Sequence, residues 1–132
     1  VDPNGEYIHY LGPLTYEAVQ AIYASSDLNV FASRCDAFGQ ILIQAMSAGL
    51  PIACSNRSAM PELLGNAGIY FDPENADDIA KAIRKLIDSP ELRSQKAKMA
   101  FERAQEYTWY RCAFETFEIL TKATRTPHSN KL

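Results

Sequence analysis

The sequence predicts an α/β domain: a Rossmann-like parallel sheet with helices on both faces. Two observations predict it. Short runs rich in β-forming residues alternate with runs whose apolar residues recur every three or four positions, which is the helical period. Capping and turn residues, among them Asn75, Ser89-Pro90 and Gly49, separate these runs. Regular strand–helix alternation favours parallel strands joined by crossover helices.

The predicted elements follow in order along the chain. Strands are expected at 7–11, 27–33, 51–55 and 68–71, and helices at 16–25, 39–48, 59–64, 76–88, 90–106 and after residue 108. Their starts carry caps at Thr15, Asn75, Ser89 and Thr108. The residues expected on inward faces are Val19, Ile22, Tyr23, Phe38, Ile41, Leu42, Ala45, Met46, Ile79, Ile83, Leu86, Ile87, Trp109, Ala113, Phe117 and Leu120.

Composition indicates one globular domain. The 132 residues are 47% hydrophobic and 22% charged, and we expect a domain over 1–124 followed by a polar, frayed tail at 125–132. Apolar runs stay far below the roughly 20 residues that cross a bilayer, and no signal peptide is visible. Three widely spaced cysteines and two histidines form no zinc or disulfide pattern, so a cytoplasmic protein without a metal is expected.

Charge is divided unevenly along the chain. Residues 1–78 hold ten acids and two bases, whereas residues 79–132 hold six acids and eleven bases. The favoured interpretation is that the basic half forms solvated helix faces. The alternative is a peripheral contact with the anionic inner face of the membrane. No basic stripe interleaved with aromatic residues is present, which argues against nucleic acid as a partner.

The loop at 33–39 is the candidate ligand site. It follows the strand at 27–33 and precedes a helix, and parallel sheets bind ligands beyond the carboxyl ends of their strands. Gly39 would let a phosphate approach the helix amides, while Asp36 and Gln44 suit hydroxyl groups. Together these groups fit a nucleotide sugar. The alternative is structural: Asp36 caps the loop, Gln44 is solvated, and Phe38 plugs the core.

The order of these pieces resembles a known family. Four segments resemble, in family order, the C-terminal nucleotide-sugar-binding half of GT-B fold retaining glycosyltransferases. They are YIHYLGPL, YASSDLNVFASRCDAFGQILIQAMSAGLPIACSN, MPELLGNAGIYFDPENADDIAKAI and YTWYRCAFETF. The family pattern is two glutamates separated by seven residues. Asp36 and Gln44 stand at that spacing and depart from it at both ends. The resemblance places the first residue by the donor sugar and the second by the ribose hydroxyls.

The resemblance implies a reaction and further contacts. A hexosyl unit would pass from a nucleoside-diphosphate sugar, as donor substrate, to an acceptor hydroxyl with retention, without a cofactor. Asp36 would be the catalytic carboxylate. Backbone amides at Phe38, Gly39 and Gln40 would meet the sugar or phosphates, and the turn from Gly12 to Leu14 would border the base. Arg34 would lend charge to the phosphates; its alternative is an exposed loop cation. Ser58-Ala59 stands where the family often has paired glycines.

The resemblance also implies absent parts. Family members have an N-terminal acceptor domain, and strands that precede the equivalent of 7–11 and lie in the middle of the sheet. We therefore expect an incomplete, inactive donor-binding fragment that associates with itself through exposed sheet edges. The alternative function is a non-catalytic module that binds a nucleotide or a protein, because both glutamates of the motif are replaced. A dinucleotide-binding or P-loop protein is disfavoured, because neither glycine-rich signature occurs.

Overall fold

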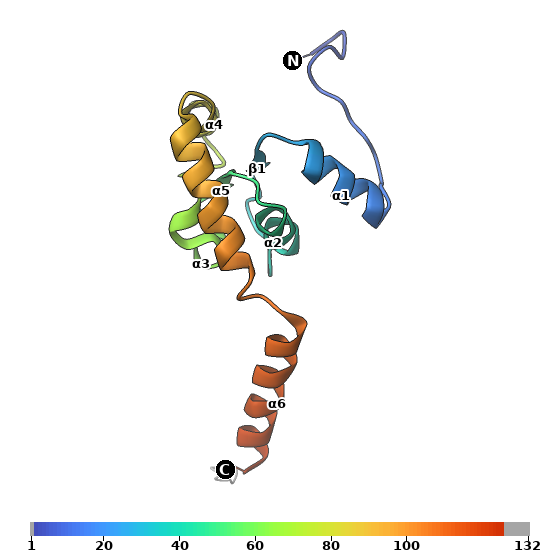
Figure 1. Cartoon of the computed structure of the whole chain (residues 1–132), viewed down its shortest axis with the longest axis vertical. Coiled ribbons are helices and arrows are strands. Elements are labelled where there is room, and N and C mark those ends of the chain that lie inside the picture. Colours follow the sequence, from blue (N-terminus) through green and yellow to red (C-terminus); the bar gives the residue numbers. More distant parts are fainter. Residues whose placement is uncertain (1, 126–132) are drawn as a thin grey trace, which may run out of the picture.

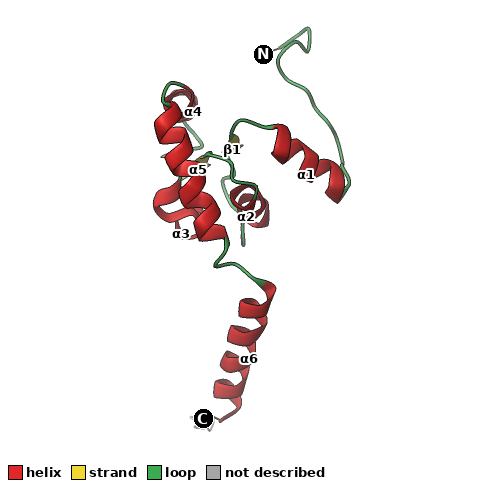
Figure 2. Cartoon of the chain, in the orientation of Figure 1, coloured by secondary structure: helices red, strands yellow, loops and turns green. Residues whose placement is uncertain are grey.

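The computed structural model of the chain describes residues 2–125 (Figure 1). The predicted tail at 125–132 therefore lies, beyond Arg125, outside the described residues. The elements in chain order are α1 (Tyr16–Ser25), β1 (Asn29–Phe31), α2 (Gln40–Ser47), β2 (Ile52–Ser55), α3 (Met60–Leu64), a 3₁₀ turn (Gly65–Ala67), β3 (Ile69–Phe71), α4 (Ala76–Ile87), α5 (Pro90–Ala104) and α6 (Trp109–Arg125). Helices make up most of the described chain (Figure 2).

The sheet is parallel, as predicted, with the strand order β1-β2-β3. Ala53 of β2 is aligned with Val30 on one side and Ile69 on the other. All four residues of β2 are buried, as expected of a central strand covered on both faces. The carboxyl ends of the three strands therefore lie at one edge, where the loops after β1, β2 and β3 meet.

Side chains of β2 alternate between two apolar layers. Ile52 and Cys54 belong to the larger core cluster, which also contains buried residues of α2, α3 and α5. Ala53 belongs to the second cluster, with Phe71 of β3 and Leu86 of α4. This period of two is the strand geometry expected from the sequence. The domain therefore has three layers, with the sheet between α4 on one face and α2, α3 and α5 on the other.

The predicted helix caps are confirmed. The side-chain oxygen of Asn75 accepts from the amides of Asp77 and Asp78, and that of Ser89 accepts from Leu92. Thr15 and Thr108 cap α1 and α6 in the same way. Such caps are each worth about 1 kcal/mol, because they satisfy amides that have no partner within the helix.

The predicted strand at 7–11 is wrong. Residues 7–11 are exposed irregular chain that runs away from the sheet to the far end of α1 (Figure 1). The physical reason is that a strand needs a neighbour, and the described residues offer none beside this segment. β1 is consequently an edge strand. The Oδ1 atom of its residue Asn29 is buried without a hydrogen-bond partner among the described residues.

Several predicted inward residues are also wrong. Phe38 and Ile41 are exposed, whereas Leu42, Ala45 and Met46 of the same stripe are fully buried. Ile87 is exposed at the end of α4, where Leu86 fills the core instead. The predicted stripe of α6, formed by Trp109, Ala113, Phe117 and Leu120, is exposed throughout, because α6 projects from the body of the domain (Figure 1).

Candidate functional site

The loop at 33–39 lies at the carboxyl end of β1, as the sequence predicted, and it leads directly into α2. Its last residue, Gly39, has φ +68°, which is the left-handed region that disfavours other residues. A Cβ atom at Gly39 would lie 2.5 Å from Cδ1 of Leu63 and 3.1 Å from Cε of Met60. The backbone conformation therefore favours glycine at this position, and a side chain there would also force the ends of the Leu63 and Met60 side chains to shift.

Asp36 organises this loop through its carboxylate. Oδ1 of Asp36 accepts hydrogen bonds from the amide of Phe38 at 2.9 Å and from the amide of Gly39 at 2.5 Å. These two bonds hold the pKa of Asp36 below its ordinary value, and the bond from Gly39 has the larger effect. The carboxylate is therefore charged at neutral pH. It is held against two of the amides that the family resemblance assigns to the donor.

Ser58 connects this loop to the loop after β2. Its hydroxyl donates to the backbone oxygen of Asp36 at 2.7 Å and lies 3.4 Å from the Asp36 amide nitrogen, from which it accepts. Ser58 has φ +55° and is the one non-glycine residue among the described residues with positive φ. The turn before it is shaped by Ser55, whose hydroxyl accepts from the Arg57 amide at 3.2 Å.

Two ion pairs join the same edge to the loop after β3. Arg34 pairs with Glu74 at 2.6 Å, and Arg57 pairs with Asp72 at 3.1 Å. The pKa of Asp72 is lowered by the Glu74 amide and by the Arg57 guanidinium. These pairs are largely exposed, so each contributes little stability. Both cations are thus near the candidate site but engaged with carboxylates, and an anionic ligand would compete for them.

The remaining predicted site residues differ in their exposure and in their position relative to Asp36. Gln40 is exposed in the first turn of α2, and Gln44 is half-buried one turn further on. Phe38 has 59% of its surface exposed, so it is a surface aromatic beside the helix start and not a core plug. Gly12 and Leu14 lie before α1, at the end of that helix remote from β1 (Figure 1), and the structure does not bring them to Asp36.

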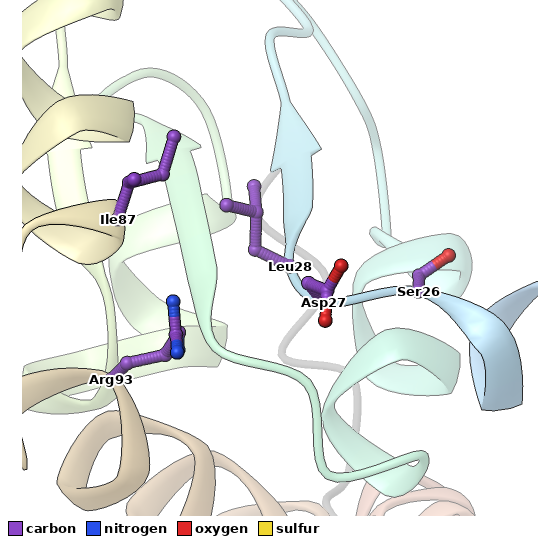
Figure 3. Close-up of a pocket in the computed structure, with 5 residues that line it drawn as sticks. All are labelled: Ser26, Asp27, Leu28, Ile87 and Arg93. Atoms are coloured by element: carbon purple, nitrogen blue, oxygen red, sulfur yellow. The ribbon is translucent and has the colours of Figure 1, made fainter. Parts of the chain in front are cut away.

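A broad groove lies at the opposite edge of the sheet. It has a volume of about 580 Å³ and is lined by Ser26, Asp27, Leu28, Ile87 and Arg93 (Figure 3). The first three precede β1, so this groove is at the amino end of the strands. It brings together one carboxylate and one guanidinium on open surface. The loops at the carboxyl edge hold the denser set of polar groups, and the candidate site remains there.

Other kinds of site find little support within residues 2–125. No group of three or more histidine, cysteine or acidic residues is placed to hold a metal ion in that part of the chain. Cys35, Cys54 and Cys112 are free thiols. Burial raises the pKa of Cys54 to about 12, so this thiol stays protonated and is a poor nucleophile. None of the described helices is long and apolar enough to span a bilayer.

The fold and the site's position define a Rossmann-like domain of the GT-B glycosyltransferase class, corresponding to its C-terminal part. The chain belongs to the family described as Glycosyl transferases group 1, whose model matches residues 3–103. It is 31% identical over 110 residues to the O-antigen chain mannosyltransferase B of Escherichia coli, and the aligned region covers 83% of this chain and 29% of that relative. It is 29% identical over 105 residues to the sulfoquinovosyl transferase SQD2 of Arabidopsis thaliana, covering 76% and 21% respectively.

Solved structures support the same fold. Sucrose-phosphate synthase from Thermosynechococcus elongatus matches 91% of this chain and 31% of its own, with a TM-score of 0.81 and 22% identity. HepE of Anabaena, solved in complex with UDP, matches 76% of this chain and 29% of its own, with a TM-score of 0.70 and 22% identity. The chain thus spans less than a third of the length of these relatives.

Proposed function

We propose that this chain is the donor-binding part of a retaining glycosyltransferase that moves a hexosyl unit from a nucleoside-diphosphate sugar to an acceptor hydroxyl. The observation that carries the proposal is the position of Asp36, Phe38 and Gly39 at the carboxyl edge of a parallel sheet, in a chain of this family. The relatives add support, because a mannosyltransferase and a sulfoquinovosyl transferase transfer sugars and because HepE was solved with UDP.

In the proposed site, each group has a separate role. Asp36 faces the donor sugar and is the catalytic carboxylate, while Gln44 binds the ribose hydroxyls. The Phe38 and Gly39 amides exchange Oδ1 of Asp36 for sugar or phosphate oxygens, and the Gln40 amide binds these oxygens as well. The bond from the anomeric carbon to the diphosphate oxygen breaks, a bond to the acceptor oxygen forms, and the acceptor hydroxyl gives its proton to the leaving diphosphate. The rate gain comes mainly from groups already placed for the developing charge.

Besides these amides, three other proposed contacts need either a rearrangement or a part of the protein that this chain does not span. Arg34 would exchange Glu74 for the diphosphate. The turn from Gly12 to Leu14 would border the base only if residues 7–11 joined the sheet. The acceptor would be held by the part of the relatives that this chain does not span. The donor is a substrate, and no cofactor enters the proposal.

Variants at Asp36 in the full-length enzyme test this function. Asp36→Ala should lower the transfer rate by about 100-fold or more, on the scale seen when a group that stabilises a transition state is removed. Asp36→Asn retains an oxygen that can accept from the Phe38 and Gly39 amides, so this variant keeps the loop conformation but removes the negative charge. Gln40→Ala should have a much smaller effect than either. Transfer by Asp36→Ala at the rate of the wild type would exclude the catalytic role.

One observation favours the second candidate, a non-catalytic nucleotide- or protein-binding module. The Asp36 carboxylate already holds two amides of its own loop, which is a structural role sufficient to explain its presence. Calorimetry with nucleoside diphosphates, followed by a transfer assay on the full-length protein, separates the two candidates. Binding without transfer would support the module.

A further inference from the structure

We propose that Ser58 is a positioning residue for the donor site, a latch that holds the Asp36 loop in the conformation that receives the nucleotide. This inference rests on the proposed function, and it adds a residue that touches neither the sugar nor the phosphates in that proposal. Ser58 belongs to the loop after β2, whereas Asp36 belongs to the loop after β1.

The contact is specific in its atoms. The Ser58 hydroxyl donates to the backbone oxygen of Asp36 and accepts from the backbone amide of the same residue. One hydroxyl therefore holds both polar backbone groups of Asp36. The Asp36 side chain then points to the amides of Phe38 and Gly39. Through Asp36, Ser58 sets the direction of the amides at the start of α2.

The backbone of Ser58 indicates that the contact has a cost. Its φ of +55° lies in the left-handed region, where a residue with a Cβ atom is strained and glycine is not. A serine at this position therefore lowers the stability of its own turn relative to glycine. Strain of this kind is typical of functional sites, where neighbouring structure holds it in place. The hydroxyl is the hydrogen-bonding group that glycine would lack, so the latch accounts for the serine.

Two substitutions separate the hydroxyl from the strain. Ser58→Gly removes the latch and relieves the backbone, whereas Ser58→Ala removes the latch and keeps the strained φ. Both should weaken binding of UDP or GDP to the chain by about five- to tenfold, the value of one hydrogen bond. Ser58→Gly should nevertheless unfold at a higher temperature than Ser58→Ala. A purely structural role would not weaken binding in the variant whose backbone is relaxed.

A measurement without ligand distinguishes this inference from the proposed function. Hydrogen exchange of the Phe38 and Gly39 amides, followed by NMR, should be faster in both variants than in the wild type. If the wild type binds neither nucleotide but exchange is faster in the variants, the proposed function fails, while the role of Ser58 in holding the Asp36 loop stands. Unchanged exchange at both amides, or wild-type nucleotide affinity in Ser58→Gly, would overturn the latch.

Discussion

Replacing Gly39 by alanine tests how the start of α2 is built. The new Cβ atom would lie 2.5 Å from Cδ1 of Leu63, a residue that is only 7% exposed, so the α3 side chain must shift. Overpacking of this kind costs about 1–3 kcal/mol. The left-handed φ of Gly39 adds roughly 1 kcal/mol for a residue with a side chain. The free energy of unfolding should therefore fall by about 2–4 kcal/mol, which is a large part of a typical domain's stability.

Gly49→Ala is the matched control for this substitution. Gly49 also has a left-handed φ, +73°, but no atom lies within 4 Å of the position of its Cβ. This variant should lose only the backbone contribution of roughly 1 kcal/mol. Thermal and urea unfolding, followed by circular dichroism, measures both variants. Equal losses of stability at the two positions would refute the contact between α3 and Gly39.

Three further predictions concern stability. The pKa of Asp36 is lower in the folded chain than its unfolded value of about 3.8, so the ionised carboxylate stabilises the fold above pH 3.8. This stabilisation is lost as the pH falls through the folded pKa. Acid unfolding curves should therefore show the difference in stability between wild type and Asp36→Ala becoming smaller below pH 3.8. Arg103 donates from Nε to the backbone oxygen of Leu63 at 2.5 Å. Arg103→Met should therefore lower the free energy of unfolding, measured in urea, by about 2 kcal/mol, and Arg103→Lys should lower it less. An unchanged free energy of unfolding in Arg103→Met would contradict the role of Arg103 in holding α3. Leu86→Ala should cost about 2–5 kcal/mol and Ile87→Ala under about 1 kcal/mol, and the reverse order would contradict the assigned face of α4.

Much of the fold could be predicted because its signals are local. Caps such as Asn75 and Ser89 act within one helical turn, so their sequence context is sufficient. The strand at 7–11 fails because pairing depends on a neighbour that no local pattern supplies. The exposure of Phe38, Ile41 and Ile87 was missed for a related reason. Periodicity shows that a helix has an apolar face, but only its packing partners decide how much of that face is covered.

The sequence predicted where the candidate loop lies but not the hydrogen bonds that hold it. The place of Asp36 follows from strand order, and its spacing to Gln44 follows from the family motif. The two hydrogen bonds that Asp36 accepts from the amides of its own loop correspond only to the structural alternative for this residue. The contact with Ser58 was missed, because 22 residues separate the two positions. One signal was available: a serine where the family often has glycine indicates a left-handed backbone, which the structure has.

An NMR titration of this chain with a nucleoside diphosphate tests the central claim most directly. We expect saturable binding, with the largest changes in amide chemical shift at Phe38, Gly39 and Gln40 and smaller changes around Gln44. The absence of binding would contradict it. So would shifts concentrated in the groove at the other edge of the sheet, around Leu28, with the 33–39 loop unchanged.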